Sequence, residues 1–161
     1  MGLFDGEIVT PDAMIIIHLA DLRLLSSFLI WASGEIAITV AVLREAKYYR
    51  EGPIDLSGYI KEGTIIKESM SDTREIRLFQ EYLEGGISGT QIHEGEASCL
   101  AVAIVNNYGL ASDEKVVRKE FARVMPNNLC LTSRIIIERA GDKHYLEKRE
   151  VRQYVKGLSY L

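Results

Sequence analysis

Acidic residues stand at three points where the sequence pattern predicts that a strand ends or a helix begins. Asp12 follows a predicted first strand, and Glu96 begins a predicted apolar helix. Asp113 follows another short predicted strand, with Glu114 beside it. In open α/β sheets, ligand sites form at the carboxyl ends of the strands. The spacing of these acids therefore favours one shared site at that edge of a sheet.

Each of these acids also has a purely structural interpretation. Asp12 belongs to the residue types that cap helix N-termini, and Glu96 would complement the positive end of a helix dipole. Asp113 and Glu114 fit an ordinary helix start. Taken singly, each acid is more often structural than functional, so the chemical interpretation depends on their convergence.

Glu45 adds an acid from a separate part of the chain. A helix predicted over residues 40–50 puts Glu45 on one stripe with Val42 and Tyr49, so its carboxylate is expected to face a partly apolar surface. An unpaired buried carboxylate is costly, which predicts a nearby cation. A Lys or Arg side chain would serve, and so would a metal ion.

Several converging carboxylates repel one another unless a cation lies among them. Mg²⁺ and Mn²⁺ prefer oxygen ligands, and either ion can activate a water and stabilise the charge that develops on a phosphate. The acids therefore suggest a divalent-metal site that acts on a phosphate ester.

The elements that would position these acids alternate between strand and helix. Strands are expected at residues 7–11, 36–40, 64–67, 110–112 and 128–131. Helices are expected to begin at residues 13 and 96 and to extend over residues 40–50 and 114–124. A further helix is expected to begin at a capping box formed by Asp72 and Glu75 and to end at Gly85-Gly86. Two more are expected near residues 134–140 and 146–157. Residues 53–63 are expected to be a loop. Such alternation is typical of an α/β fold with a mostly parallel sheet that helices cover on both faces.

Composition predicts a single domain over residues 1–161, because 47% hydrophobic content is enough for a full core. His18, Asp21 and Arg23 interrupt the apolar run 14–31, and no basic segment precedes it. A membrane span and a secretory signal are therefore not expected. Cys99 and Cys130 have no metal-ligand spacing and are predicted to be buried thiols, which favours a reducing, cytoplasmic location.

The net charge of −4 is unevenly distributed. Residues 115–161 carry eleven Lys and Arg against five Asp and Glu, a net of +6, whereas residues 1–114 carry a net of −10. The basic part is either a solvated helical face or a flank that follows a phosphate backbone beside an acidic site.

The segments that contain these acids resemble the PIN-domain ribonucleases, in particular the branch that includes VapC-like toxins of toxin–antitoxin pairs. The resemblance lies in Asp12 with the apolar IIIHLA that follows it, Glu45 in VLREA, HEGEASCLAVA around Glu96, and ASDEKVVR around Asp113. It extends from about residue 7 to about residue 140.

The resemblance implies a three-layer α/β/α sandwich with a central, mostly parallel sheet. It implies a metal-dependent endoribonuclease in which Asp12, Glu96 and Asp113 or Glu114 hold Mg²⁺ or Mn²⁺, and Glu45 is a further ligand or orients the attacking water. Asp113 is favoured over Glu114 because it lies nearer the strand end. RNA is the expected substrate, and an antitoxin and a second copy of the chain are expected partners.

Departures from the family pattern keep a second interpretation open. Ala13 and Met14 stand where the family often has a small polar residue, and Ala111 stands where it commonly has Ser or Thr. A catalytically inactive PIN-like binding or assembly module is therefore the alternative. A phosphatase is a weaker rival, because no second Asp lies two residues after Asp12. In the nuclease, Arg118, Lys119 and Arg123 of the basic flank would bind the RNA backbone.

Overall fold

The computed structural model describes residues 2–161, in which a five-stranded sheet forms the centre of the fold. Its strands, in the order β5-β2-β1-β6-β7, are β5 (Ile65–Glu68), β2 (Ile36–Thr39), β1 (Val9–Pro11), β6 (Gly109–Ala111) and β7 (Cys130–Leu131). Each pairing is parallel, as the alternation of strands and helices predicts. The carboxyl ends of β1 and β6 therefore lie side by side.

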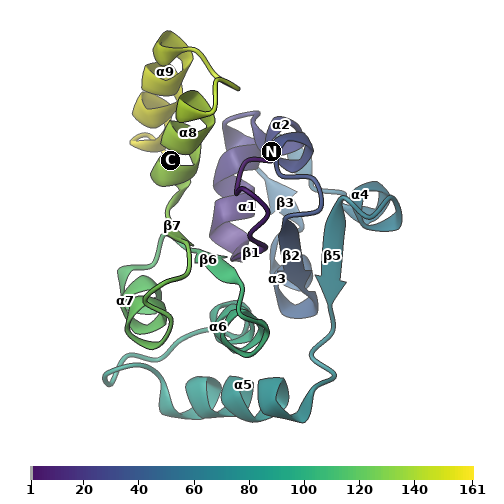
Figure 1. Ribbon diagram of the computed structural model, residues 1–161, viewed down its shortest axis with the longest axis vertical. Coiled ribbons are helices and arrows are strands. Elements are labelled where there is room, and N and C mark those ends of the chain that lie inside the picture. The colour runs from purple at the N-terminus through teal and green to yellow at the C-terminus, as the bar shows by residue number, and fades with distance from the viewer. Residues whose placement is uncertain (1) are drawn as a thin grey trace.

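Helices cover both faces of this sheet, so the predicted three-layer α/β/α sandwich is confirmed (Figure 1). One layer contains α1 (Ala13–Asp21), α2 (Leu25–Trp31) and α8 (Ser133–Asp142), with α9 (Lys148–Leu158) against α8. The other contains α6 (Glu94–Asn106), α5 (Thr73–Gly85) and α7 (Lys115–Val124). The short helix α3 (Val40–Glu45) follows β2 directly.

Helix α6 is the most deeply buried helix, as its small and apolar residues predict. Ala97, Ser98 and Ala101 are fully buried, and these small side chains let α6 lie close to β1, β2 and β6. Cys99 is also buried, and its thiol donates to the carbonyl of Pro11 at 3.6 Å. Cys130 is only half-buried, so the predicted burial is confirmed for one cysteine and incomplete for the other.

The structure corrects two predictions between residues 40 and 63. The helix predicted over 40–50 ends at Glu45, because Ala46 leaves helical geometry and the chain forms an antiparallel hairpin of β3 (Tyr48–Tyr49) and β4 (Gly52–Pro53). The predicted loop 53–63 contains a short helix, α4 (Ser57–Lys61), next to β5. The local sequence is too short for a periodic pattern in either place.

The apolar run 14–31 forms two helices and not one. Arg23 has a positive φ of 61° in the turn between α1 and α2, and the chain bends by 117° from the first helix to the second. Within residues 2–161 no single helix is long and apolar enough to cross a membrane, although this bent pair passes by length and composition.

The predicted capping box of Asp72 and Glu75 is confirmed at the start of α5, and the helix ends at Gly85 as predicted. Gly86 follows with a φ of 64°, and a Cβ at this position would overlap the carbonyl oxygen of Thr90. Only glycine meets both requirements without strain.

Replacing Gly86 with Ala should therefore lower the free energy of unfolding by about 1–3 kcal/mol, because the positive φ and the contact with Thr90 both penalise a Cβ. Gly85→Ala is the matched control, since nothing lies within 4 Å of a Cβ there. It should leave stability unchanged or raise it slightly. Urea unfolding measures both variants, and equal effects would contradict the account of this turn.

Candidate metal and phosphate site

Four carboxylates from separate segments line one pocket of about 340 Å³. Asp12 follows β1, Glu45 ends α3, Glu96 lies in the first turn of α6, and Glu114 is the N-cap residue of α7. The remaining lining residues are Ala13, Met14, Ile17 and His93. The pocket lies at the carboxyl ends of β1 and β6, where the sequence predicts a shared acidic site.

Asp12 is the most buried of these acids, with 3% of its surface exposed. Its Oδ1 accepts the N–H of Ile15 at 3.1 Å and so caps α1. Burial raises the pKa of Asp12 to about 6, against the opposing effect of hydrogen bonds from Ser112 and Ile15. The nearby charges of Asp113 and Glu96 contribute less to this rise than burial does. A cation in the pocket would oppose this rise.

Glu45 differs from its prediction. It is exposed at the end of α3 and shares no helical stripe with Tyr49, which lies in β3. Its Oε1 accepts the N–H of Gly95 at 3.0 Å, at the N-terminus of α6. The predicted burial of Glu45 is therefore wrong, and its carboxylate does not require a cation, because the end of a helix supplies a positive partner. A Cβ on Gly95 would overlap the Glu45 carboxylate, so glycine permits this approach.

Glu96 and Glu114 approach the pocket from two helix starts. Glu96 is half-buried, and its Oε1 accepts the N–H of His93 at 3.0 Å. Glu114 is exposed, and its own N–H donates to the Ser112 hydroxyl oxygen at 3.1 Å. Because the buried Ser112 hydroxyl also bonds to Asp12, it links the backbone at Glu114 to the Asp12 carboxylate.

Asp113 is not among the residues that line the pocket, because neighbouring groups hold both of its oxygens. Oδ2 bonds to His18 Nδ1 at 2.8 Å and to the Ser133 hydroxyl at 2.5 Å, while Oδ1 accepts the Ser133 N–H at 2.8 Å. Burial opposes ionisation of Asp113, but these bonds outweigh it and lower the pKa. The bond to Asp113 also raises the pKa of His18. Asp113 thus ties α1 and α8 together beside the pocket.

The four carboxylates line the same pocket, but their oxygens are not arranged as the ligands of a metal ion. Among residues 2–161, no group of three or more His, Cys, Asp or Glu side chains already has the arrangement of a metal site. The cap expected of Asp12 and the position of Glu96 at the positive end of a helix are confirmed, and the two acids line the same pocket. An all-oxygen donor set of this kind suits Mg²⁺ or Mn²⁺.

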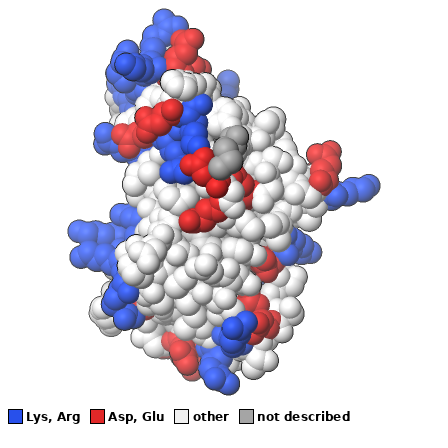
Figure 2. All heavy atoms as spheres, in the orientation of Figure 1, with Lys and Arg blue, Asp and Glu red and all other residues white. Residues whose placement is uncertain are grey.

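Two of the three predicted RNA-binding cations are already engaged within the chain. Arg118 donates to the Ser112 carbonyl at 2.9 Å, and Arg123 pairs with Glu120, whereas Lys119 is exposed. Other Lys and Arg side chains gather where α8 and α9 form one end of the molecule (Figure 2). Those of α9 are Lys148, Arg149, Arg152 and Lys156.

The sequence pattern gave little sign of three other residues at this site. His93 lines the pocket, Ser112 joins two of its acids, and Ser133 holds Asp113. The position of Ser112 directly before the acidic pair was its one signal. Comparison with protein-family models and with curated proteins gave no match for this chain.

The raised pKa of Asp12 should be visible in how the free energy of unfolding depends on pH when no metal is bound. A carboxyl whose folded pKa exceeds its unfolded value of 3.8 stabilises the fold fully below that value and loses this contribution as pH rises to about 6. Asp12→Asn should therefore raise the free energy of unfolding in EDTA at pH 8 by up to about 3 kcal/mol. The gain should vanish near pH 4, as measured by urea unfolding.

Asp113→Asn is the matched control with the opposite sign. Because the folded pKa of Asp113 is lowered, its carboxylate stabilises the fold above the unfolded pKa, and this contribution is lost as pH falls. The variant should be less stable than the parent at pH 8, with a smaller difference at low pH. A gain in Asp12→Asn that is equal at both pH values would contradict the burial argument.

Proposed function

We propose that this chain is a divalent-metal-dependent endoribonuclease that resembles the PIN-domain ribonucleases. The observation that carries the proposal is the pocket at the carboxyl ends of β1 and β6, which four carboxylates from four segments line. Bonds from backbone N–H groups at helix starts account for Asp12, Glu45 and Glu96 singly, whereas the Glu114 side chain makes no capping bond, and capping gives no reason for all four acids to share one cavity.

The residues fit a hard divalent cation in their chemistry. Asp12, Glu96 and Glu114 would hold the ion, with Glu45 as a further oxygen ligand. A bound Mg²⁺ or Mn²⁺ would polarise the phosphodiester and lower the pKa of a water molecule for attack. The high pKa of Asp12 supports this proposal, because burial makes its negative charge costly and a bound cation would offset that cost.

Other residues of the chain would position the ligands. Ser112 fixes the Asp12 carboxylate and the backbone at Glu114, and Arg118 holds the carbonyl of Ser112. Ser112 stands two residues before Glu114, the spacing that the PIN-domain pattern commonly has before its last acid. Asp113 would hold α1 and α8 in place beside the pocket through its bonds to His18 and Ser133.

The basic part of the chain would bind the RNA backbone, chiefly through Lys119 and the exposed cations of α9. An antitoxin that covers the acidic pocket and a homodimer are expectations that rest on the resemblance alone. Light scattering on the purified chain tests the dimer, and a strict monomer at tens of micromolar would count against it.

A catalytically inactive binding module is the second candidate. The observation that favours it is that Asp12, Glu45 and Glu96 each accept a backbone N–H near a helix start, so stability alone would retain them. This module would bind its partner equally well with and without a divalent metal. The nuclease would cleave RNA only with one.

Purified protein should cleave single-stranded RNA with Mg²⁺ or Mn²⁺ and lose this activity in EDTA. Asp12→Asn should reduce the rate at least about a hundredfold while remaining folded, because a ligand is lost and the others shift. Gel analysis of labelled RNA measures the rate, and circular dichroism controls for folding. Unchanged cleavage by Asp12→Asn would refute this assignment of the site.

Calorimetric titration of Mn²⁺ decides between the two neighbouring acids. The sequence favours Asp113 as the metal ligand because it lies nearer the end of the strand, whereas Glu114 is the acid that lines the pocket. We expect Glu114→Gln to weaken Mn²⁺ binding more than Asp113→Asn, whose main effect should be lower stability. The reverse order would restore Asp113 as the ligand, and equal losses would mean that both acids act as one ligand set.

A further inference from the structure

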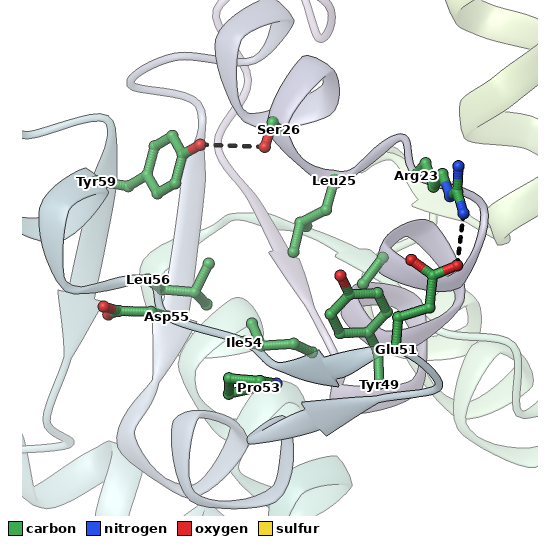
Figure 3. Close-up of a pocket in the computed structure, with 11 residues that line it drawn as sticks. Arg23, Leu25, Ser26, Tyr49, Glu51, Pro53, Ile54, Asp55, Leu56 and Tyr59 are labelled. Carbon is green, nitrogen blue, oxygen red and sulfur yellow. Dashed lines mark hydrogen bonds and ion pairs between the residues drawn. The ribbon is translucent and has the colours of Figure 1, made fainter.

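A second pocket, of about 370 Å³, lies between the α1–α2 turn, the β3–β4 hairpin and α4 (Figure 3). Leu25, Ile54 and Leu56 form much of its apolar wall, and the rings of Tyr49 and Tyr59 stand on different sides of it. Its size and its mixed apolar and polar lining are within the range of small-molecule sites.

Several polar side chains around this pocket are already paired, so its aromatic and apolar side chains are free to contact a ligand. Arg23 forms an ion pair with Glu51 at 2.7 Å, and the Tyr59 hydroxyl donates to Ser26 at 3.3 Å (Figure 3). Asp55 accepts the hydroxyl and the N–H of Ser57.

The two pockets lie along the same side of α1. Ala13 and Ile17 line the acidic pocket, and Ala20 lines the second pocket. These residues are spaced i, i+4 and i+7, so they share one face of the helix. The nine residues of α1 span about 13 Å. A short stretch of extended chain could therefore reach from one pocket to the other.

Segment 44–50 forms the other side of the path between the two pockets, opposite α1. It runs from the acidic pocket at Glu45 to the second pocket at Tyr49. It carries three exposed cations, Arg44, Lys47 and Arg50, on either side of Tyr49, whose ring lines the second pocket. Cations interleaved with aromatic rings are typical of surfaces that bind single-stranded nucleic acid, where phosphates meet the charges and bases stack on the rings.

We infer that the second pocket binds an unstacked nucleobase of a single-stranded RNA whose backbone runs along segment 44–50 to the acidic pocket. The base inserts beside the ring of Tyr49, and Arg44, Lys47 and Arg50 contact the phosphates. This inference rests on the proposed function for its substrate class. The competing occupant is an apolar side chain of a protein partner, which would not need the flanking cations.

Binding without cleavage tests the pocket independently of catalysis. In EDTA, fluorescence anisotropy with a labelled single-stranded RNA should give an affinity about five- to tenfold weaker for Tyr49→Leu, which removes the ring and keeps apolar volume. Tyr48→Leu is the matched control, because neighbouring strand residues point to opposite sides. It should change the affinity less than twofold. A fully paired RNA should not distinguish Tyr49→Leu from the parent.

Photo-crosslinking covers the case in which Tyr49→Leu fails to fold. RNA with a single 5-iodouridine, moved one position at a time, should crosslink to the peptides that contain Tyr49 or Tyr59 from one position only. Crosslinks confined to other peptides, or an equal loss of affinity in Tyr48→Leu and Tyr49→Leu, would overturn the inference. So would RNA affinity that Tyr49→Leu leaves unchanged.

These outcomes separate the pocket from the proposed reaction. Cleavage with Mn²⁺ but no role for Tyr49 would leave the nuclease standing and remove the base pocket. Tyr49-dependent binding of RNA without cleavage would keep the base pocket and favour the inactive module. An absence of RNA binding would contradict both.

Discussion

The burial of the Asp12 carboxylate at the end of β1 is the constraint around which the site is organised. Only 3% of this side chain is exposed, and its pKa rises to about 6 because water no longer solvates the charge. Asp12 directly follows the central strand β1 and caps α1, so it cannot leave the carboxyl edge of the sheet without disturbing both elements. The neighbouring structure must tolerate that charge.

The N-termini of helices supply much of the positive charge that stabilises these carboxylates. Backbone N–H groups at the starts of α1 and α6 bind Asp12, Glu45 and Glu96, so positive ends of helix dipoles face the carboxylates. Gly95 lets the Glu45 carboxylate approach α6 where any side chain would block it. This arrangement holds the acids in place but leaves Asp12 with a strongly raised pKa. A divalent cation bound beside Asp12 would offset the cost of burying this charge.

Much of the architecture follows from local sequence patterns. The parallel sheet, the buried α6 and the capping box of Asp72 and Glu75 are confirmed because each has a periodic or capping signal. The convergence of Asp12 and Glu96 also follows, since parallel strands bring their carboxyl ends to one edge. Glu45 was predicted to belong to this site on a wrong argument, because its helix ends early and its side chain is exposed.

Features that depend on contacts between distant segments could not be predicted from the sequence pattern. The hold of His18 and Ser133 on Asp113 joins residues that are 95 and 20 positions from it, and no local rule predicts such pairings. The hairpin at Tyr48–Tyr49 and the helix α4 are each too short to show a period, so the second pocket could not be predicted either.

A manganese anomalous difference map from a crystal soaked in Mn²⁺ tests the central claim most directly. The account predicts a peak within the pocket lined by Asp12, Glu45, Glu96 and Glu114, with carboxylate oxygens at coordination distance. A crystal that takes up Mn²⁺ only elsewhere on the molecule, or leaves this pocket empty at saturating metal, would contradict it.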